Sequence, residues 1–286
     1  MTKGQAVILG VVEGLTEYLP ISSTGHLLIA ERIMGIGESR SGTSEIKQQA
    51  KKASDAYTIC IQWGAIIAVL GLYFRRVIQM TRGLMGKDPV GRRLLLNMAA
   101  GFLPAAIIGL LFNETIKTHL FGPWPVVIAW FIGGLAILAV SWRNYIGLRQ
   151  IHSGISFDNL TWQLALVIGF AQCIAMWPGV SRSLVTIVGG LLVGLSMPAA
   201  VEYSFLLGMV TLGAATVYDA IAHGEVMLQT FDVPSLAIGL VFAFVSAIIS
   251  VKWMVTYLER HGLALFGYYR VGLGIVTAVL LATHMI

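Results

Sequence analysis

The sequence has few charged residues, and this scarcity argues against a soluble protein. Only 12% of its 286 residues are Asp, Glu, Lys or Arg, whereas 57% are hydrophobic; soluble domains carry about 25% charged residues. Apolar blocks of membrane-spanning length recur up to the C-terminus, which disfavours a soluble domain with a single anchor. We therefore predict one integral membrane domain over residues 1–286.

Cysteine is nearly absent as well. The two cysteines, Cys60 and Cys173, lie in apolar segments without disulfide or metal-binding spacing, so we expect buried thiols. The first apolar segment lacks a small-residue cleavage site, which argues against a signal peptide. The formal net charge of +5 comes from loop residues that orient a membrane protein, and it indicates no nucleic-acid partner.

Six apolar segments are long enough to cross a hydrocarbon core about 30 Å thick. They are residues 57–74, 94–112, 125–142, 199–222, 233–257 and 263–284.

Two further apolar regions are divided by a proline into halves too short to span. Residues 5–18 and 26–34 flank Pro20, and residues 162–176 and 183–195 flank Pro178. A pair of half-helices that enters and leaves on one side fits both regions. Irregular backbone is tolerated at membrane depth only when protein or a wet cavity shields it.

The two broken regions hold corresponding places in two halves of the chain, residues 1–142 and 155–286. Gly10-Val-Val-Glu13 aligns with Gly169-Phe-Ala-Gln172, and broken segments in matching positions are typical of internally duplicated membrane proteins. Apolar helices can also match by chance. We predict an all-α polytopic membrane protein with six transmembrane helices and two re-entrant helical hairpins, arranged as an inverted-topology repeat.

The orientation follows from a basic connection at residues 75–93. It contains Arg75, Arg76, Arg82, Lys87, Arg92 and Arg93. We expect this loop to be cytoplasmic, which places the polar stretch 37–54 in an external loop and both chain ends outside. The lysines of residues 47–52 count against this orientation, but the six basic residues outweigh them.

Two carboxylates lie four residues apart in the first broken region, so a helix would place Glu13 and Glu17 on one face. A charge at the bilayer centre costs at least ~2.5 kcal/mol and is functional by default. A divalent cation or a shared proton relieves the repulsion between the carboxylates, and Mg²⁺ is commonly held by one or two carboxylates with substrate phosphate oxygens. The residues alone leave open a metal site and a proton-sharing pair on a transport path.

Hydroxyl clusters stand where the second half-helix of each broken region begins. They are Ser22, Ser23 and Thr24 in the first region, and Ser181 and Ser183, which flank Arg182, in the second. A helix N-terminus is a natural anion site, although a single serine there can be a simple N-cap. The guanidinium of Arg182 suits phosphate. His26, close to hydroxyls and carboxylates, is a candidate acid, base or nucleophile.

At these motifs the chain resembles the bacterial undecaprenyl-diphosphate phosphatase family of the bacitracin-resistance type. The motifs are Glu13-Gly-Leu-Thr-Glu17, Leu19-Pro-Ile-Ser-Ser-Thr-Gly-His26 and Pro178-Gly-Val-Ser-Arg-Ser-Leu-Val-Thr186. The resemblance covers nearly the whole chain, including Ile61-Gln62-Trp63-Gly64 and Glu202-Tyr-Ser-Phe-Leu-Leu207. The polar stretch 37–54 is longer than the family's usual connection there.

The resemblance implies hydrolysis of the terminal phosphate of a C55 lipid diphosphate. This reaction regenerates the carrier for peptidoglycan synthesis and confers bacitracin resistance. The site would open to the outer, periplasmic side of the bacterial cytoplasmic (inner) membrane. It would use a divalent cation, Mg²⁺ or Ca²⁺, held by Glu13 and Glu17.

Roles for the other motif residues are carried over from the family by position. Glu17, Ser23, His26 and Arg182 are then catalytic, with Ser23 and His26 as nucleophile and base. Arg182 clamps the diphosphate. The remaining substrate-binding residues are Ser22, Thr24, Ser181, Ser183 and Thr186.

A secondary transporter or lipid flippase is the rival class, because opposed half-helices are also what transporters use. A structural scaffold explains none of the intramembrane charges. The expected partners are a polyprenyl diphosphate substrate and membrane lipids, and a homodimer is compatible with the sequence. Whether Ser23, His26 or a metal-bound water attacks phosphorus stays open.

Overall fold

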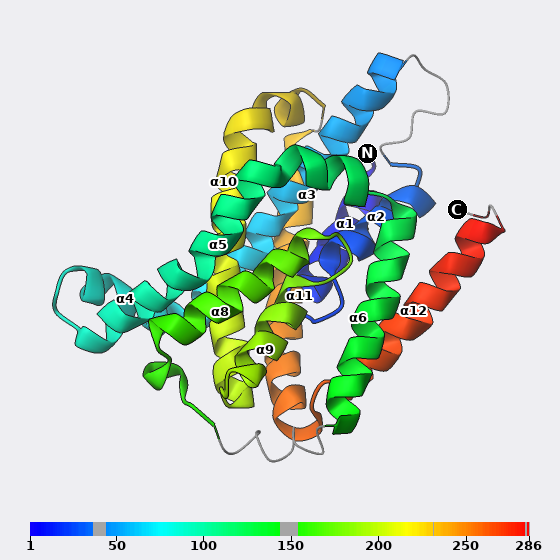
Figure 1. The fold of residues 1–286 in the computed structure, drawn as a ribbon. Helices are drawn as coiled ribbons and strands as arrows, with labels where there is room; N and C mark the ends of the chain where they lie inside the picture. Colours follow the sequence, from blue (N-terminus) through cyan, green and yellow to red (C-terminus); the bar gives the residue numbers. More distant parts are fainter. Residues whose placement is uncertain (37–43, 144–153, 231, 284, 286) are drawn as a thin grey trace.

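The computed structural model describes residues 1–36, 44–143, 154–230, 232–283 and 285, and nearly all of its elements are helices (Figure 1). The only β-pairing in these ranges is an isolated bridge between Ile155 and Leu195. Five helices are long and apolar enough to cross a membrane, or six if the bent pair α3–α4 is one span. The prediction of an all-α, multi-pass membrane protein is confirmed.

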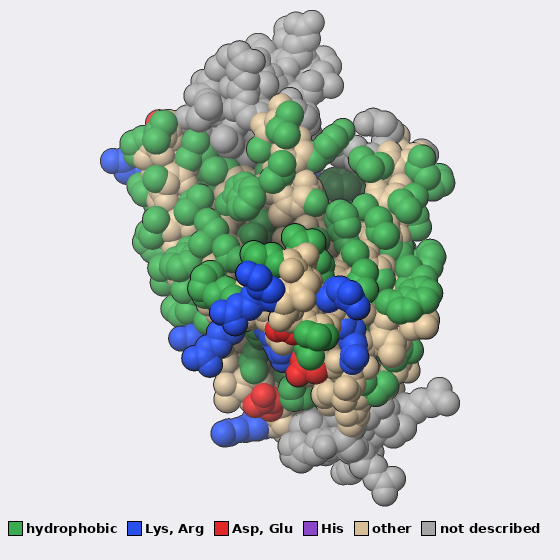
Figure 2. Space-filling view, turned by 90° about the vertical axis from the view of Figure 1, so that its left-hand side faces the viewer, with side chains coloured by type: hydrophobic (Ala, Val, Ile, Leu, Met, Phe, Trp, Pro, Cys, Tyr) green, Lys and Arg blue, Asp and Glu red, His purple; other side chains and the backbone are tan. Residues whose placement is uncertain are grey.

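The long helices coincide with the predicted spans. They are α3 (Ser44–Leu72), α5 (Pro89–Leu120), α6 (Pro123–Arg143), α10 (Met197–Thr230), α11 (Val233–His261) and α12 (Ala264–Ala282). Many large apolar side chains point outward from them, among them Leu110, Leu111 and Ile221. Figure 2 shows hydrophobic side chains over much of one face, as expected where lipid replaces water.

Two segments that we predicted as loops contain helix. Residues 44–54 form the first turns of α3, while 37–43 lie outside the described residues. Most of the basic connection consists of α4 (Phe74–Leu84) and the start of α5. High charge density suggested loops, but Lys, Arg, Glu and Gln are good helix formers, and α4 also buries Met80 and Gly83. The side of the membrane on which each segment lies stays a prediction.

The two broken regions are short helices, as predicted. The first consists of α1 (Lys3–Thr16) and α2 (Ser23–Ile33), and the second of α8 (Trp162–Gln172), the 3₁₀ turn η2 (Cys173–Met176) and α9 (Arg182–Leu192). We call residues 17–22 the first tip and residues 177–181 the second tip. Proline disfavours a helix interior because it lacks an N–H group and its ring clashes with the preceding turn, which favours the interruptions at Pro20 and Pro178, although α5 continues through Pro104.

The two tips share an unusual backbone conformation. Ser22 and Ser181 are the only non-glycine residues with positive φ in the described ranges, at 73° and 72°. Each caps the following helix, with its hydroxyl accepting the N–H of Gly25 or Leu184. Such backbone is strained for an L-residue and persists only where surrounding structure enforces it. The same strain at matching positions agrees with an internal repeat.

Paired glycines also match between the halves. Helix α1 packs on α11 and α8 packs on α5. A side chain at Gly10 would overlap the Gly239 carbonyl, and one at Gly169 would overlap the Gly101 carbonyl. Small residues let membrane helices approach closely. These pairs agree with the alignment of Gly10 with Gly169, while the full inverted-repeat arrangement stays a prediction.

The first tip lies inside the largest hydrophobic cluster. Tyr18 and Leu19 are buried there with residues of the long helices, and the Tyr18 ring packs edge-on against Phe205 of α10, with 5.2 Å between centroids. The fold therefore holds the polar tip residues within a packed apolar interior.

Candidate active site

The two tips are bound to each other. The Ser183 hydroxyl donates to the Leu19 carbonyl at 2.8 Å, and the Ser181 hydroxyl lies 3.4 Å from the same oxygen. Two of the hydroxyls predicted to bind substrate therefore hold the first tip against the start of α9.

Arg270 of α12 ties both tips together. Its side chain is fully buried. Its Nη1 donates to the carbonyls of Val180 at 3.1 Å and Pro20 at 3.4 Å, and its Nη2 donates to those of Gly179 and Ala129, both at 2.9 Å. Arginine suits this position because its planar fork carries five donors. We interpret Arg270 as the residue that fixes the spacing of the tips.

A charged cluster joins the two broken regions beside these contacts. Glu17 accepts a short hydrogen bond from the Ser23 hydroxyl through Oε2. Its other oxygen, Oε1, lies 3.2 Å from Nη2 of Arg182, and the two side chains are only 5% and 10% exposed. Buried ions need such pairing, because an unpaired charge in a low-dielectric interior is costly.

Arg182 has further partners that aim its guanidinium. Nη1 donates to the Ser204 carbonyl at 3.0 Å, and the guanidinium carbon lies 5.6 Å from the centre of the Tyr18 ring. The Thr186 hydroxyl lies 2.6 Å from that of Ser204 and donates to the Arg182 carbonyl. Thr186, predicted as a substrate ligand, thus supports the backbone around Arg182.

Glu13 differs from Glu17, the other buried acid of the site. It is fully buried, and within the described part of the chain neither carboxylate oxygen has a hydrogen-bond partner. Its counterpart Gln172 donates to the Gly101 carbonyl and accepts from the Thr211 hydroxyl, each at 3.4 Å. Buried polar groups normally have hydrogen-bond partners. The contrast therefore indicates that a ligand, a cation or a proton binds the Glu13 carboxylate.

A metal ion fits this donor set only with help from the substrate. In the ranges that the structure describes, no three His, Cys, Asp or Glu side chains are grouped to hold an ion. Two carboxylates are supplied by Glu13 in the last turn of α1 and by Glu17, the residue that caps this helix. The Glu17 N–H donates to the Glu13 carbonyl at 2.9 Å. Two carboxylates are usual for Mg²⁺ that also binds phosphate oxygens.

His26 forms its hydrogen bonds with groups outside the Glu17–Ser23–Arg182 cluster. Its Nδ1 lies 2.6 Å from the Ser22 carbonyl and its Nε2 lies 2.8 Å from the Tyr269 hydroxyl. A carbonyl only accepts, so Nδ1 carries a proton, and in the neutral tautomer Nε2 accepts from Tyr269. The Ser23 hydroxyl bonds to Glu17 instead, and the predicted Ser23–His26 pairing stays a prediction.

The remaining predicted residues divide by exposure. Thr24 is exposed, whereas Ser22 is buried and caps α2. The structure therefore brings together Glu17, Ser23 and Arg182. The hydroxyls of Ser22, Ser181 and Ser183 form hydrogen bonds with other groups of the protein.

Sequence reasoning missed Arg270, Tyr269 and Ser204. Arg270 interrupts an apolar span, and a charge at such a position signals function. No local pattern identifies Tyr269 or Ser204, because each acts through a partner distant in sequence, His26 and Arg182 respectively.

Comparison with known sequences agrees with the motifs. The family described as "Bacitracin resistance protein BacA" matches residues 6–276. An undecaprenyl-diphosphatase of Sorangium cellulosum is 45% identical over 271 residues, 94% of this chain and 83% of that protein. An undecaprenyl-diphosphatase of Nitrosomonas eutropha is 42% identical over 281 residues, which are 98% of this chain and 94% of that protein. Undecaprenyl-diphosphatase 2 of Rhodospirillum rubrum is 42% identical over 273 residues, which are 95% of this chain and 92% of that protein. The chain belongs to the bacitracin resistance protein BacA family.

Proposed function

We propose that this protein hydrolyses undecaprenyl diphosphate to undecaprenyl phosphate and orthophosphate. The observation that carries the proposal is the buried contact of Glu17 with both Ser23 and Arg182, in a family whose relatives are named undecaprenyl-diphosphatase. The reaction would recycle the lipid carrier for cell-wall synthesis and would confer bacitracin resistance.

The hydrogen bonds suggest a division of roles within the cluster. The Ser23 oxygen attacks the terminal phosphorus, its proton passes to Glu17, and the bond to the bridging oxygen breaks to release undecaprenyl phosphate. Water then hydrolyses the phosphoserine and yields orthophosphate. The guanidinium of Arg182 presents two donors to the phosphate oxygens, where negative charge accumulates.

His26 is the second candidate for the base. Its bond to the Ser22 carbonyl fixes the ring, and its Nε2 is already hydrogen-bonded to the Tyr269 hydroxyl. A change of side-chain rotamer would be needed before it could take a proton from Ser23. Glu17 requires no such change, which favours the carboxylate.

Glu13 and Glu17 would hold a divalent cation, Mg²⁺ or Ca²⁺. The two unpartnered oxygens of Glu13 support this assignment. Bound there, the cation would offset negative charge on the phosphate oxygens. Protonation of Glu13 would satisfy the same observation, and a thermal-shift titration with Mg²⁺ distinguishes the two.

We infer that the protein resides in the bacterial inner membrane with its site open to the periplasm. The six basic residues around α4 support this orientation, because positively charged connections stay in the cytoplasm. The prenyl tail of the substrate would remain in lipid between the helices.

Phosphate release in detergent separates the phosphatase from the rival transporter. Purified protein is mixed with undecaprenyl diphosphate in neutral micelles, and orthophosphate is measured over time. A phosphatase releases orthophosphate without any bilayer. A lipid flippase releases none, and that result would refute the proposed function.

A further inference from the structure

The helix that follows the first full span has the geometry of an interfacial helix. Helix α3 is apolar from Tyr57 to Leu72, and α4 then departs from its direction by 78°. A span that leaves a membrane and turns through such an angle continues nearly along the surface. Exposed apolar and basic side chains occur together on α4 and just beyond it. Phe74, Leu84 and Met85 are exposed, as are the neighbouring Arg75 and Arg82. This composition is typical of helices that lie in the headgroup region.

Close packing fixes α4 in place. A side chain at Gly83 would overlap the backbone of Arg92, and one at Gly91 would overlap the Gln79 carbonyl, so α4 and α5 contact backbone to backbone. Arg76 of α4 also pairs with Glu202 of α10 and with Asp158, both at 2.8 Å. The helix is therefore a rigid platform and not a loose connection.

Ion pairing leaves an excess of positive charge on this platform. Arg76 is compensated by two carboxylates. The side chains of Arg75, Arg82, Lys87 and Arg92 are exposed, and within the described residues none of them is in a salt bridge. Figure 2 shows Lys and Arg side chains gathered on both sides of a small acidic centre on this face. A cluster of uncompensated cations beside a membrane span attracts anionic lipid.

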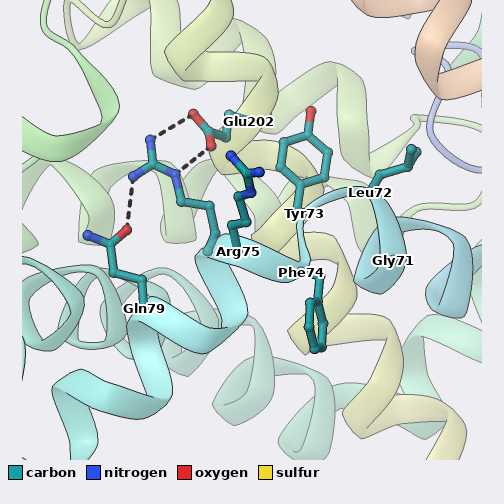
Figure 3. A pocket seen from close by; sticks show the side chains of 8 residues that line it. Gly71, Leu72, Tyr73, Phe74, Arg75, Gln79 and Glu202 are labelled. Carbon is teal, nitrogen blue, oxygen red and sulfur yellow. Dashed lines mark hydrogen bonds and ion pairs between the residues drawn. The ribbon is translucent and has the colours of Figure 1, made fainter.

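A cavity at the α3–α4 bend offers an anionic group a place to bind beside one of these exposed cations, Arg75. It has a volume of about 580 Å³ and is lined by residues 71–76, Gln79 and Glu202. Figure 3 shows Arg75 extending to the same side as Tyr73 and Glu202, whereas Phe74 points away from them. Arg75 is the lining cation without a carboxylate partner, while the exposed Phe74 offers an apolar surface on the opposite side of the α3–α4 bend.

We propose that α4 and this cavity bind an anionic glycerophospholipid, with its phosphate at Arg75, which lines the cavity, and its acyl chains against Phe74 and the end of α3. Arg82, two turns farther along α4, adds positive charge to the same surface. The proposal does not depend on the phosphatase activity. A glycerophospholipid is the occupant of choice because cations and exposed apolar side chains lie together where a span leaves the membrane. Bound lipid would hold α4 at the membrane surface and stabilise the α3–α4 bend.

Thermal stability in defined micelles tests this proposal. The full-length protein is purified in a neutral detergent, and its Tm is measured while phosphatidylglycerol or phosphatidylcholine is added. We expect phosphatidylglycerol to raise the Tm and phosphatidylcholine to leave it unchanged. Each basic side chain near an anionic surface contributes about fivefold in binding, so an Arg75→Gln/Arg82→Gln variant should need about 25-fold more phosphatidylglycerol.

Arg260→Gln is the matched control. Arg260 is an exposed arginine in the last turn of α11, on the side that we predict to be the same. This variant should respond to phosphatidylglycerol as the wild type does. Orthophosphate release by both variants in neutral detergent should equal that of the wild type, because neither site contacts the Glu17 cluster. If the double variant does not fold, Arg82→Gln alone should show about a fivefold weaker response.

Two results would overturn the proposal. One is an equal response of the wild type and the double variant to phosphatidylglycerol. The other is a rise in Tm, lost in the double variant, that occurs with farnesyl phosphate or inorganic phosphate but not with phosphatidylglycerol. The latter result would assign the cavity to a prenyl phosphate or a free anion.

Discussion

At the scale of single residues, the site depends on which buried charges have partners. Arg182 and Glu17 form an ion pair across the two broken regions, with Ser23 on the second carboxylate oxygen. Glu13, one turn away, has no protein partner in the described part of the chain. Two acids on one helix face therefore have different energetic consequences when they are changed, and substitution can separate their roles.

Arg182→Lys should fold but lose most of its turnover. Lysine keeps the positive charge but offers no planar pair of donors for phosphate. The loss of one preorganised donor costs about 10²–10³ in kcat. The KM should change little, because the prenyl tail supplies much of the binding. Arg93→Lys is the control. A fully active Arg182→Lys variant would remove Arg182 from the catalytic residues and leave it only the ion pair with Glu17.

Glu13→Gln should stabilise the metal-free protein while lowering its activity. A neutral amide is cheaper to bury than a carboxylate without a partner, so the Tm in a chelator should rise. Added Mg²⁺ should raise the Tm of the wild type and not that of the variant. A lower Tm of the variant in chelator would show that the Glu13 carboxylate has a stabilising partner.

Glu17→Gln should lower both activity and stability. The substitution leaves the buried Arg182 without its countercharge, and breaking one side of a buried pair costs about 3–5 kcal/mol. Turnover should fall below detection, because the Ser23 proton loses its acceptor. The Tm and orthophosphate release are measured on one preparation. Near-normal turnover would reject Glu17 as base and as metal ligand.

At the scale of the elements, the sequence predicts the broken helices but not the contacts that lock them. Pro20 and Pro178 divide apolar segments too short to span, and this local signal was sufficient. The bonds of Arg270 to both tips join positions about 90 and 250 residues apart, so no local pattern contains them. The positive φ of Ser22 and Ser181 is likewise imposed by packing, because serine has no intrinsic preference for it. Helix α4 was missed because its charges were taken to mark a loop.

Arg270→Lys should loosen the junction of the tips. An ammonium has three donors and cannot reach four carbonyls in two directions, and each unsatisfied buried carbonyl costs about 1–3 kcal/mol. We expect a lower Tm. We also expect a lower kcat at temperatures where the variant is fully folded, which a purely structural role would not produce. An unchanged kcat in the folded variant would restrict Arg270 to stability.

At the scale of the whole molecule, orientation decides which compartment the site serves. In a Cys60→Ala/Cys173→Ala background, a cysteine at Lys87 should resist an impermeant thiol reagent in intact cells, because the surrounding arginines mark the cytoplasm. A cysteine at Ser39, in the predicted external stretch, should be labelled. The reverse pattern would place the opening of the site on the cytoplasmic side.

The central claim is that the buried Glu17–Ser23–Arg182 cluster cleaves a lipid diphosphate, and one measurement tests it most directly. Orthophosphate release from undecaprenyl diphosphate is compared for the wild type, Ser23→Ala and Ser250→Ala in the same detergent. Ser250 is also buried and bonds the Leu15 carbonyl at 2.7 Å, so it controls for the loss of a buried hydroxyl. We predict that Ser23→Ala loses turnover on the order of a thousandfold or more, while Ser250→Ala keeps it. Equal release by Ser23→Ala and the wild type would contradict the account.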